Sequence, residues 1–148
     1  MERAPSRISA EAFLALIHAT IPSSRTIDLQ FDALQFGFVR LRQRFDPAHV
    51  RAGGTISGPT LMGLADTALY AMVLSLVGLE PLAVTTDLSF HFLSKPGPVD
   101  LIAEARVLKH GRRLVVGDTL LYSDGKAEPV VHATGTYALP SAPLATAT

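Results

Sequence analysis

Asp66 is the only charged residue between Pro59 and Leu79, in the run PTLMGLADTALYAMVLSLVGL. An ionised carboxylate in so apolar a segment is costly unless another group pairs with it. Because a helix that is apolar on every side is a buried helix, the run predicts a buried helix with one carboxylate near its start. Carboxylates kept in such surroundings cluster at functional sites. Asp66 is therefore the first candidate for chemistry.

The same run allows two other interpretations. Asp66 could be a structural acid that accepts hydrogen bonds from Thr67 or from neighbouring backbone. The run also approaches the ~20 residues that a bilayer-spanning helix needs. Thr60, Thr67 and Ser75 interrupt it, and it lacks a flanking Lys/Arg bias, so we predict a buried core helix and no membrane partner.

The bulk composition narrows the class of protein. The chain has 148 residues, of which 48% are apolar and 18% charged, with a net charge of zero. This length predicts one domain with a sizeable core, and the neutral balance predicts no nucleic-acid partner. There is no cysteine, so no disulfide, thiolate nucleophile or thiolate metal site can form. We expect a reducing, cytoplasmic location.

We expect the domain to cover residues 1–140, followed by a frayed tail at 141–148. Arg3 and Arg7 precede an apolar stretch that Glu11 and His18 interrupt, which favours a short amphipathic helix over an export signal. Its N-cap is predicted at Ser9, because a serine hydroxyl can accept from the first turn.

The remaining pattern predicts strands around the central helix. Alternation over 36–45 places Arg40, Arg42 and Arg44 on one side, which we interpret as protection of an edge strand. Further strand-like segments cover 84–92, 101–108, 114–122 and 129–139. In the first of these, strict alternation places Thr85 on the face opposite Leu88. Short turns at 110–111 and 124–125 favour an antiparallel meander. The sum is an α+β domain in which a curved antiparallel sheet wraps around one long central helix, the hotdog fold.

Two short motifs then suggest a family. Residues 54–59 (GTISGP) and 64–68 (LADTA) resemble the signature of the hotdog acyl-CoA thioesterases. The phenylacetate-pathway type, within the 4-hydroxybenzoyl-CoA thioesterase superfamily, is the most similar group. The resemblance continues through 84–88 (VTTDL), 92–96 (FLSKP), 109–112 (KHGR) and 133–137 (ATGTY), and so covers about residues 33 to 139.

This resemblance implies a thioester hydrolase with sites at a homodimer interface, in a dimer or a dimer of dimers. It implies that Asp66 acts as general base on water or as direct nucleophile. The backbone N–H of Gly58 would polarise the thioester carbonyl, and Thr85 would orient the attacking water. No cofactor is implied, since CoA is part of the acyl-CoA substrate.

Three positions depart from the common pattern of that family. Ser57 stands where histidine is usual, Pro59 where the second glycine is usual, and Arg51 where many members have asparagine. Ser57 can still donate a hydrogen bond to a carbonyl. Proline has no N–H, so Gly58, with help from Thr60, would carry the oxyanion. Arg51 could pair with Asp66 if it points inward.

Further residues are candidates for substrate binding. Lys95, Arg112 and Arg113 lie at strand ends and turns and could neutralise CoA phosphates. Met62 and Tyr70 could line an acyl tunnel. The five histidines are scattered without ligand spacing, so we predict no metal site and interpret them as structural or surface residues.

Two rival functions stay open at this point. One is a non-catalytic acyl-CoA-binding protein, suggested by the missing histidine and by Arg51. The other is a hydratase or dehydratase acting on acyl thioesters, although no histidine occurs in the glycine turn or the central helix.

Overall fold

The structure is a computed structural model that describes residues 2–141. Its α-helices and strands, in chain order, are α1 (Ala10–Thr20), β1 (Leu29–Gln35), β2 (Phe38–Gln43), α2 (Gly58–Val77), β3 (Val84–Phe92), β4 (Leu101–His110), β5 (Leu114–Ser123) and β6 (Pro129–Ala138). Two short 3₁₀-helices lie at Pro22–Thr26 and Pro47–His49. Of the predicted tail, residues 142–148 lie outside the described residues.

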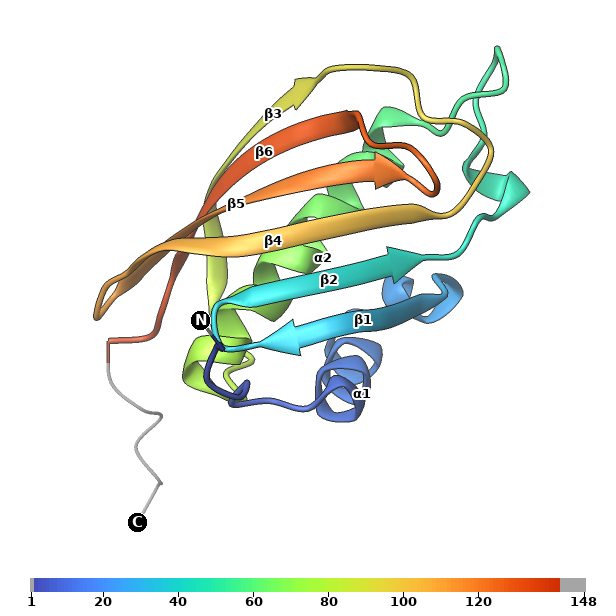
Figure 1. Cartoon of the computed structure of the whole chain (residues 1–148). Helices are drawn as coiled ribbons and strands as arrows, with labels where there is room; N and C mark the ends of the chain where they lie inside the picture. The colour runs from blue at the N-terminus through green and yellow to red at the C-terminus, as the bar shows by residue number, and fades with distance from the viewer. Residues whose placement is uncertain (1, 142–148) are drawn as a thin grey trace.

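The strands form one antiparallel six-stranded sheet in the order β1-β2-β4-β5-β6-β3. The sheet curves around α2, which runs along its concave face (Figure 1). The predicted hotdog fold is therefore confirmed, and each of the predicted helices and strands is present. The predicted N-cap is also present, since Ser9 Oγ accepts from Ala12 N–H at 3.1 Å.

The topology corrects one expectation. Strand β1 was not predicted, because a bulge between Phe31 and Ala33 interrupts its alternation. With β1 in place, β2 is an inner strand, so its arginines do not protect an edge. The meander predicted from the two short turns is confirmed for β4, β5 and β6, while β3 pairs with β6 and forms the other edge of the sheet.

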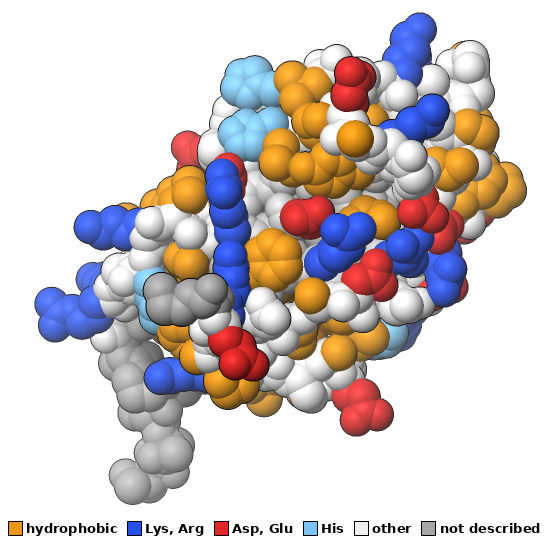
Figure 2. Space-filling view, viewed as in Figure 1, with side chains coloured by type: hydrophobic (Ala, Val, Ile, Leu, Met, Phe, Trp, Pro, Cys, Tyr) orange, Lys and Arg blue, Asp and Glu red, His pale blue; other side chains and the backbone are white. Residues whose placement is uncertain are grey.

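The arginines of β2 instead hold a network of ion pairs on the outer face of the sheet. Arg40 lies 2.8 Å from Glu104, and Arg42 lies 3.2 Å from Asp100 and 3.0 Å from Asp124. Figure 2 shows basic and acidic side chains interspersed on this face. These pairs join β2 to β4 and to the turn after β5, so opposite charges occupy neighbouring strands.

By length and composition, helix α2 could cross a membrane. However, 61% of its most apolar 18-residue stretch is buried inside the protein. Twelve of its residues are buried, most of them in its C-terminal half. The inner face of the sheet accommodates it with small residues. A Cβ at Gly117 would lie 2.8 Å from the backbone oxygen of Arg106 and would overlap Met72 of the helix. The helix is therefore the core of the domain.

This close approach generates a stability prediction. Gly117→Ala should lower the free energy of unfolding by about 1–3 kcal/mol, because the added methyl group overpacks the helix–sheet contact. Urea denaturation followed by circular dichroism measures the change. Gly63→Ala is the matched control, since a Cβ at Gly63 meets nothing within 4 Å and alanine favours helix by about 0.5–1 kcal/mol. Equal stability of the two variants would contradict the close contact.

Candidate active site

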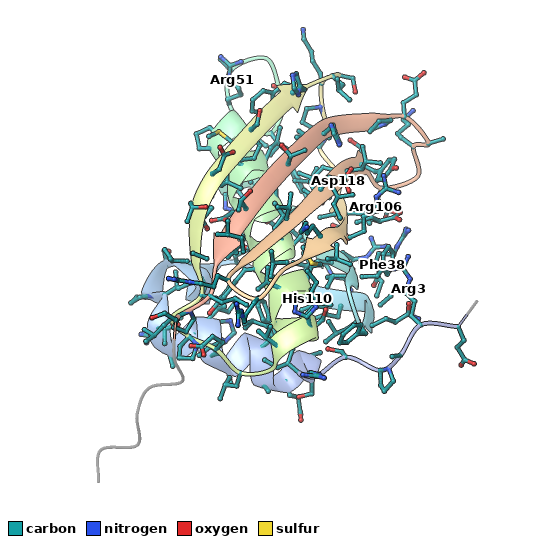
Figure 3. The ribbon with its side chains drawn as sticks, turned by 90° about the vertical axis from the view of Figure 1, so that its left-hand side faces the viewer. Arg3, Phe38, Arg51, Arg106, His110 and Asp118 are labelled. Atoms are coloured by element: carbon teal, nitrogen blue, oxygen red, sulfur yellow. The ribbon has the colours of Figure 1, made fainter. Side chains whose placement is uncertain are left out.

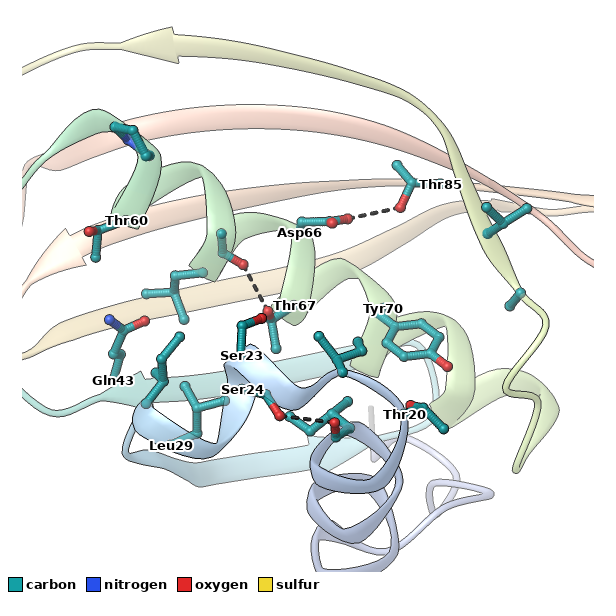
Figure 4. Close-up of a pocket in the computed structure, with 18 of the residues that line it drawn as sticks. Thr20, Ser23, Ser24, Leu29, Gln43, Thr60, Asp66, Thr67, Tyr70 and Thr85 are labelled. Atoms are coloured by element: carbon teal, nitrogen blue, oxygen red, sulfur yellow. Dashed lines mark hydrogen bonds between the residues drawn. The ribbon is translucent and has the colours of Figure 1, made fainter.

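A cavity of about 650 Å³ lies between α2, the N-terminal segment formed by α1 and the first 3₁₀-helix, and the start of β3. The residues used below that line it are Gln43, His49, Thr60, Asp66, Thr67, Tyr70, Thr85 and Tyr137. In Figure 4, Gln43 and Thr60 lie at one end and Tyr70 and Thr20 at the other, with Asp66 between the two ends and hydrogen-bonded to Thr85. Cavities of this size hold small organic ligands.

Asp66 sits in the third turn of α2 and is half-buried. Its Oδ1 accepts a hydrogen bond from Thr85 Oγ1 at 3.0 Å and a second one from the Tyr137 hydroxyl. The same Tyr137 hydroxyl lies 2.9 Å from the backbone carbonyl oxygen of Asp66. Oδ2 has no hydrogen-bond partner within residues 2–141. One carboxylate oxygen is thus fixed and the other is available to a reactant.

A bulge in β3 brings Thr85 to this carboxylate. In the β3–β6 ladder Thr85 pairs with Tyr137 and Asp87 with Thr136, so Thr86 is an extra residue. The extra residue reverses the alternation and turns Thr85 toward α2, on the same face as Leu88 and Phe90. The strict alternation expected from the sequence was therefore wrong at this point. Bulges commonly re-aim side chains in this way beside active sites.

Tyr137 is the functional residue that sequence reasoning missed. It is 3% exposed, and its ring stacks on Tyr70 with the centroids 5.9 Å apart. Burial, and then the negative charge of Asp66, raise the pKa of Tyr137 well above its usual range. The phenol therefore remains a hydrogen-bond donor at any working pH. The sequence did contain one indication of this role. Residues of β6 alternate between inward-facing and outward-facing positions, and Tyr137 occupies an inward-facing one.

The turn before α2 leaves backbone donors open. Ser57 occupies the N-cap position but makes no side-chain cap hydrogen bond, because its Oγ pairs with Thr60 Oγ1 at 2.8 Å. Pro59 contributes no N–H. A Cβ placed on Gly58 meets nothing within 4 Å, so no neighbouring atom crowds this side of the residue. The first-turn N–H groups of a helix, which lack intrahelical partners, suit a developing negative charge.

The other predicted residues are distributed as follows. Thr60 and Tyr70 line the cavity, whereas Met62 is 40% exposed and lies outside the lining. Arg51 is exposed on the loop before α2, at one end of the molecule (Figure 3), and makes no ion pair with Asp66 in this chain.

The predicted phosphate-binding residues do not come together within one chain. Lys95 is exposed just before β4, and Arg112 and Arg113 are exposed just after it. They are separated by the length of a ten-residue strand, which is about 30 Å.

One histidine has a different position from the one expected. His49, interpreted from the sequence as a structural or surface residue, lines the cavity together with Gln43. Among residues 2–141, no three or more His, Asp or Glu side chains lie together in a group that could hold a metal ion.

The fold and this constellation define a hotdog protein with an aspartate-centred cavity. The chain belongs to the thioesterase superfamily, whose sequence profile matches residues 53–130. A candidate thioesterase from Silicibacter sp. TM1040 is 40% identical, with a TM-score of 0.80 over 95% of both chains. A candidate esterase of Saccharolobus solfataricus is 34% identical over 113 residues, which are 75% of this chain and 73% of that relative.

A hypothetical thioesterase from Streptococcus pneumoniae, solved with coenzyme A, has a TM-score of 0.73. The match covers 89% of this chain and 97% of that one at 20% identity, and so concerns the fold alone. The predicted family is confirmed at the level of the superfamily.

The buried Tyr137 phenol predicts an alkaline loss of stability. An unfolded tyrosine ionises near pH 10, while the folded one retains its proton to higher pH. The unfolded state is therefore favoured as pH rises above 10, at about 1.4 kcal/mol per pH unit. Urea unfolding at pH 9, 10 and 11 should show a shallower alkaline decline for Tyr137→Phe than for the wild type. Identical declines would mean that the phenol is not held by burial and Asp66.

Proposed function

We propose that this protein is an acyl-CoA thioesterase that hydrolyses a medium-chain or aryl acyl-CoA to the free acid and CoA. The observation that carries the proposal is the arrangement of Asp66, whose Oδ1 is fixed by Thr85 and Tyr137 beside a cavity. Membership of the thioesterase superfamily supports the reaction class. The coenzyme A bound by the Streptococcus relative supports CoA as the carrier.

In the proposed reaction, Asp66 Oδ2 takes a proton from water while the water oxygen forms a bond to the thioester carbon. The carbonyl electrons move to oxygen and give a tetrahedral intermediate, which collapses as the C–S bond breaks. The proton on Asp66 then passes to the departing thiolate. In the alternative with direct attack, Oδ2 bonds to the thioester carbon, the C–S bond breaks and releases the CoA thiolate, and water then hydrolyses the resulting anhydride to the free acid and the Asp66 carboxylate. Thiols are acidic enough to leave without a strong general acid.

The oxyanion of that intermediate needs a preorganised donor. We assign this role to the N–H of Gly58, which begins α2 without a side-chain cap at its N-terminus. Such a donor typically contributes roughly 3–4 kcal/mol of transition-state stabilisation. To the Ser57 and Thr60 hydroxyls, which pair with each other, we assign the role of holding the carbonyl or the water.

We further propose that the site is completed by a second copy of the chain. Strand β3 is an edge of the sheet, and Val84, Phe92 and Leu93 at its ends are 57%, 53% and 55% exposed. An open edge with exposed apolar side chains favours pairing with another chain. A dimer, or a dimer of dimers, would cover this edge. The phenylacetate-pathway subtype and the cytoplasmic location are separate points and stay predictions.

The central test measures release of free thiol from a panel of acyl-CoAs. Asp66→Asn should lower kcat by about 10²–10⁴-fold, because the general base is lost while the shape of the site is kept. Asp87→Asn is the matched control, since Asp87 is exposed on the same strand as Thr85 and should retain full activity. Full activity of Asp66→Asn would refute the mechanism. Saturable binding of CoA esters without turnover by the wild type would favour the acyl-CoA binder.

A second experiment tests whether the site is shared between chains. Gly58→Pro removes the N–H at a position where the first helical turn tolerates proline, and should be as inactive as Asp66→Asn. If Asp66 of one chain faces Gly58 of the other, each heterodimer of the two inactive variants has one intact site. Mixing them in equal amounts and refolding should then restore about a quarter of wild-type activity to the mixture, because about half of the dimers are heterodimers. No recovery despite heterodimers seen by native mass spectrometry would place both groups of each site in one chain.

A further inference from the structure

Aromatic side chains from four elements form a continuous column that ends at Asp66. Tyr137 of β6 stacks on Tyr70 of α2, with the ring planes 6° apart and the centroids 5.9 Å apart. Tyr70 in turn meets Phe13 of α1 edge-on, with a centroid distance of 5.7 Å. Phe13 also packs edge-on against Phe31 of β1, at 5.5 Å. These four rings are the aromatic column, and the last of them carries the hydroxyl that donates to Asp66.

The aromatic column has little freedom to move. Phe13 is fully buried, and Tyr70 and Tyr137 are buried as well. Offset-stacked and edge-on rings with centroids about 4.5 to 7 Å apart are the favoured aromatic arrangements, and each contact in the column has such a geometry. Because a protein interior is close-packed, one ring can shift only if its neighbours shift with it. A change at one end of the column is therefore felt at the other end.

The ring position of Tyr137 decides where its hydroxyl lies. The hydroxyl oxygen of a tyrosine is fixed in the plane of its ring, so it moves only when the ring moves. In Tyr137 this oxygen contacts Asp66 Oδ1 and lies 2.9 Å from the backbone carbonyl oxygen of Asp66. The other donor to Oδ1 is Thr85, which is half-buried on β3, an edge strand of the sheet. Tyr137 is therefore the more rigidly held of the two donors.

Phe13 connects this arrangement to the N-terminal segment. The hydrogen bonds of α1 and of the 3₁₀-helix after it stay within that segment, as in the bond from Ser24 Oγ to the carbonyl oxygen of Ile17 at 2.9 Å. Among residues 2–141, no hydrogen bond joins residues 10–26 to α2 or to the sheet. The place of α1 against α2 therefore depends on packed side chains, and Phe13 is the fully buried ring among them.

From these contacts we infer that Phe13 is a positioning residue for Asp66. It acts through the aromatic column, whose last hydroxyl fixes one oxygen of the carboxylate and so directs the other toward the reactant. Phe13 itself lies outside the cavity lining, and α1 lies outside residues 53–130, which match the thioesterase profile. The inference rests on the proposed thioesterase function and adds the N-terminal helix to its active site. Reacting groups must be held closely, because a misplacement of about 1 Å can cost 10²-fold in rate.

The test is a double-mutant cycle on the acyl-CoA that the wild type hydrolyses best. Tyr137→Phe should lower kcat about tenfold with little change in KM, because the carboxylate loses its rigid donor while the cavity keeps its shape. Phe13→Leu should lower kcat about threefold in the wild type. It should have no further effect in Tyr137→Phe, because residues that act through one contact are not additive. Leu76→Ala is the control, since Leu76 is 1% exposed in α2 outside the column, and it should keep the wild-type kcat.

The outcomes separate this inference from the proposed function. An unchanged kcat in Phe13→Leu, or an equal loss in both backgrounds or in the control, would overturn the positioning role and leave the thioesterase function intact. If the wild type hydrolyses no acyl-CoA, the function fails, and proton NMR decides. The buried Tyr137 hydroxyl should give a slowly exchanging resonance that is missing in Tyr137→Phe. A shift or broadening of it in Phe13→Leu, but not in the control, supports the positioning role, and an unchanged resonance overturns it.

Discussion

The contact between α2 and the concave face of the sheet is the constraint on which the rest of the structure depends. A helix this apolar is stable in water only when nearly all of its surface is covered. The six strands provide that cover by curving around it, and Gly117 and Gly135 allow the close approach because neither carries a Cβ. The outer face is then left to charged residues, whose ion pairs cross from β2 to β4.

Helix α2 must be buried and must also present a carboxylate to the cavity. The two requirements are met by different halves of the helix. The C-terminal half, from Ala68 to Leu76, is buried throughout, whereas the N-terminal half borders the cavity. Asp66 lies where the two halves meet. It is held there by hydroxyls from β3 and β6, so an otherwise costly buried charge has hydrogen-bond partners and one oxygen near solvent.

Much of this arrangement was accessible from the sequence, because the signals were local. The periodicity of the segments around α2 predicted the helix and five of the six strands, and the isolated charge of Asp66 marked the centre of the candidate site. Two β-bulges made predictions from periodicity fail. The bulge in β1 interrupts the alternation of that strand, so the strand was not predicted, and the bulge in β3 turns Thr85 inward.

The contact of Tyr137 with Asp66 could not be predicted, for a related reason. Tyr137 lies in an inward-facing strand series where an apolar residue would give the same pattern. Its place beside Asp66 depends on the order of β5, β6 and β3, which is set by tertiary packing. Arg51 shows the reverse case, in which a chemically plausible pairing is not made because the loop places the side chain in solvent.

The place of β6 between β5 and β3 has a consequence for how the chain matures. During synthesis β3 emerges well before β6, which is its sole neighbour in the sheet of a single chain. Until β6 is complete, β3 has no strand to pair with, and Asp66 lacks the phenol that anchors it. Non-local pairing of this kind slows folding and exposes unpaired edges. The ribosome must therefore finish nearly the whole domain before the hydrogen-bonded arrangement around Asp66 can exist.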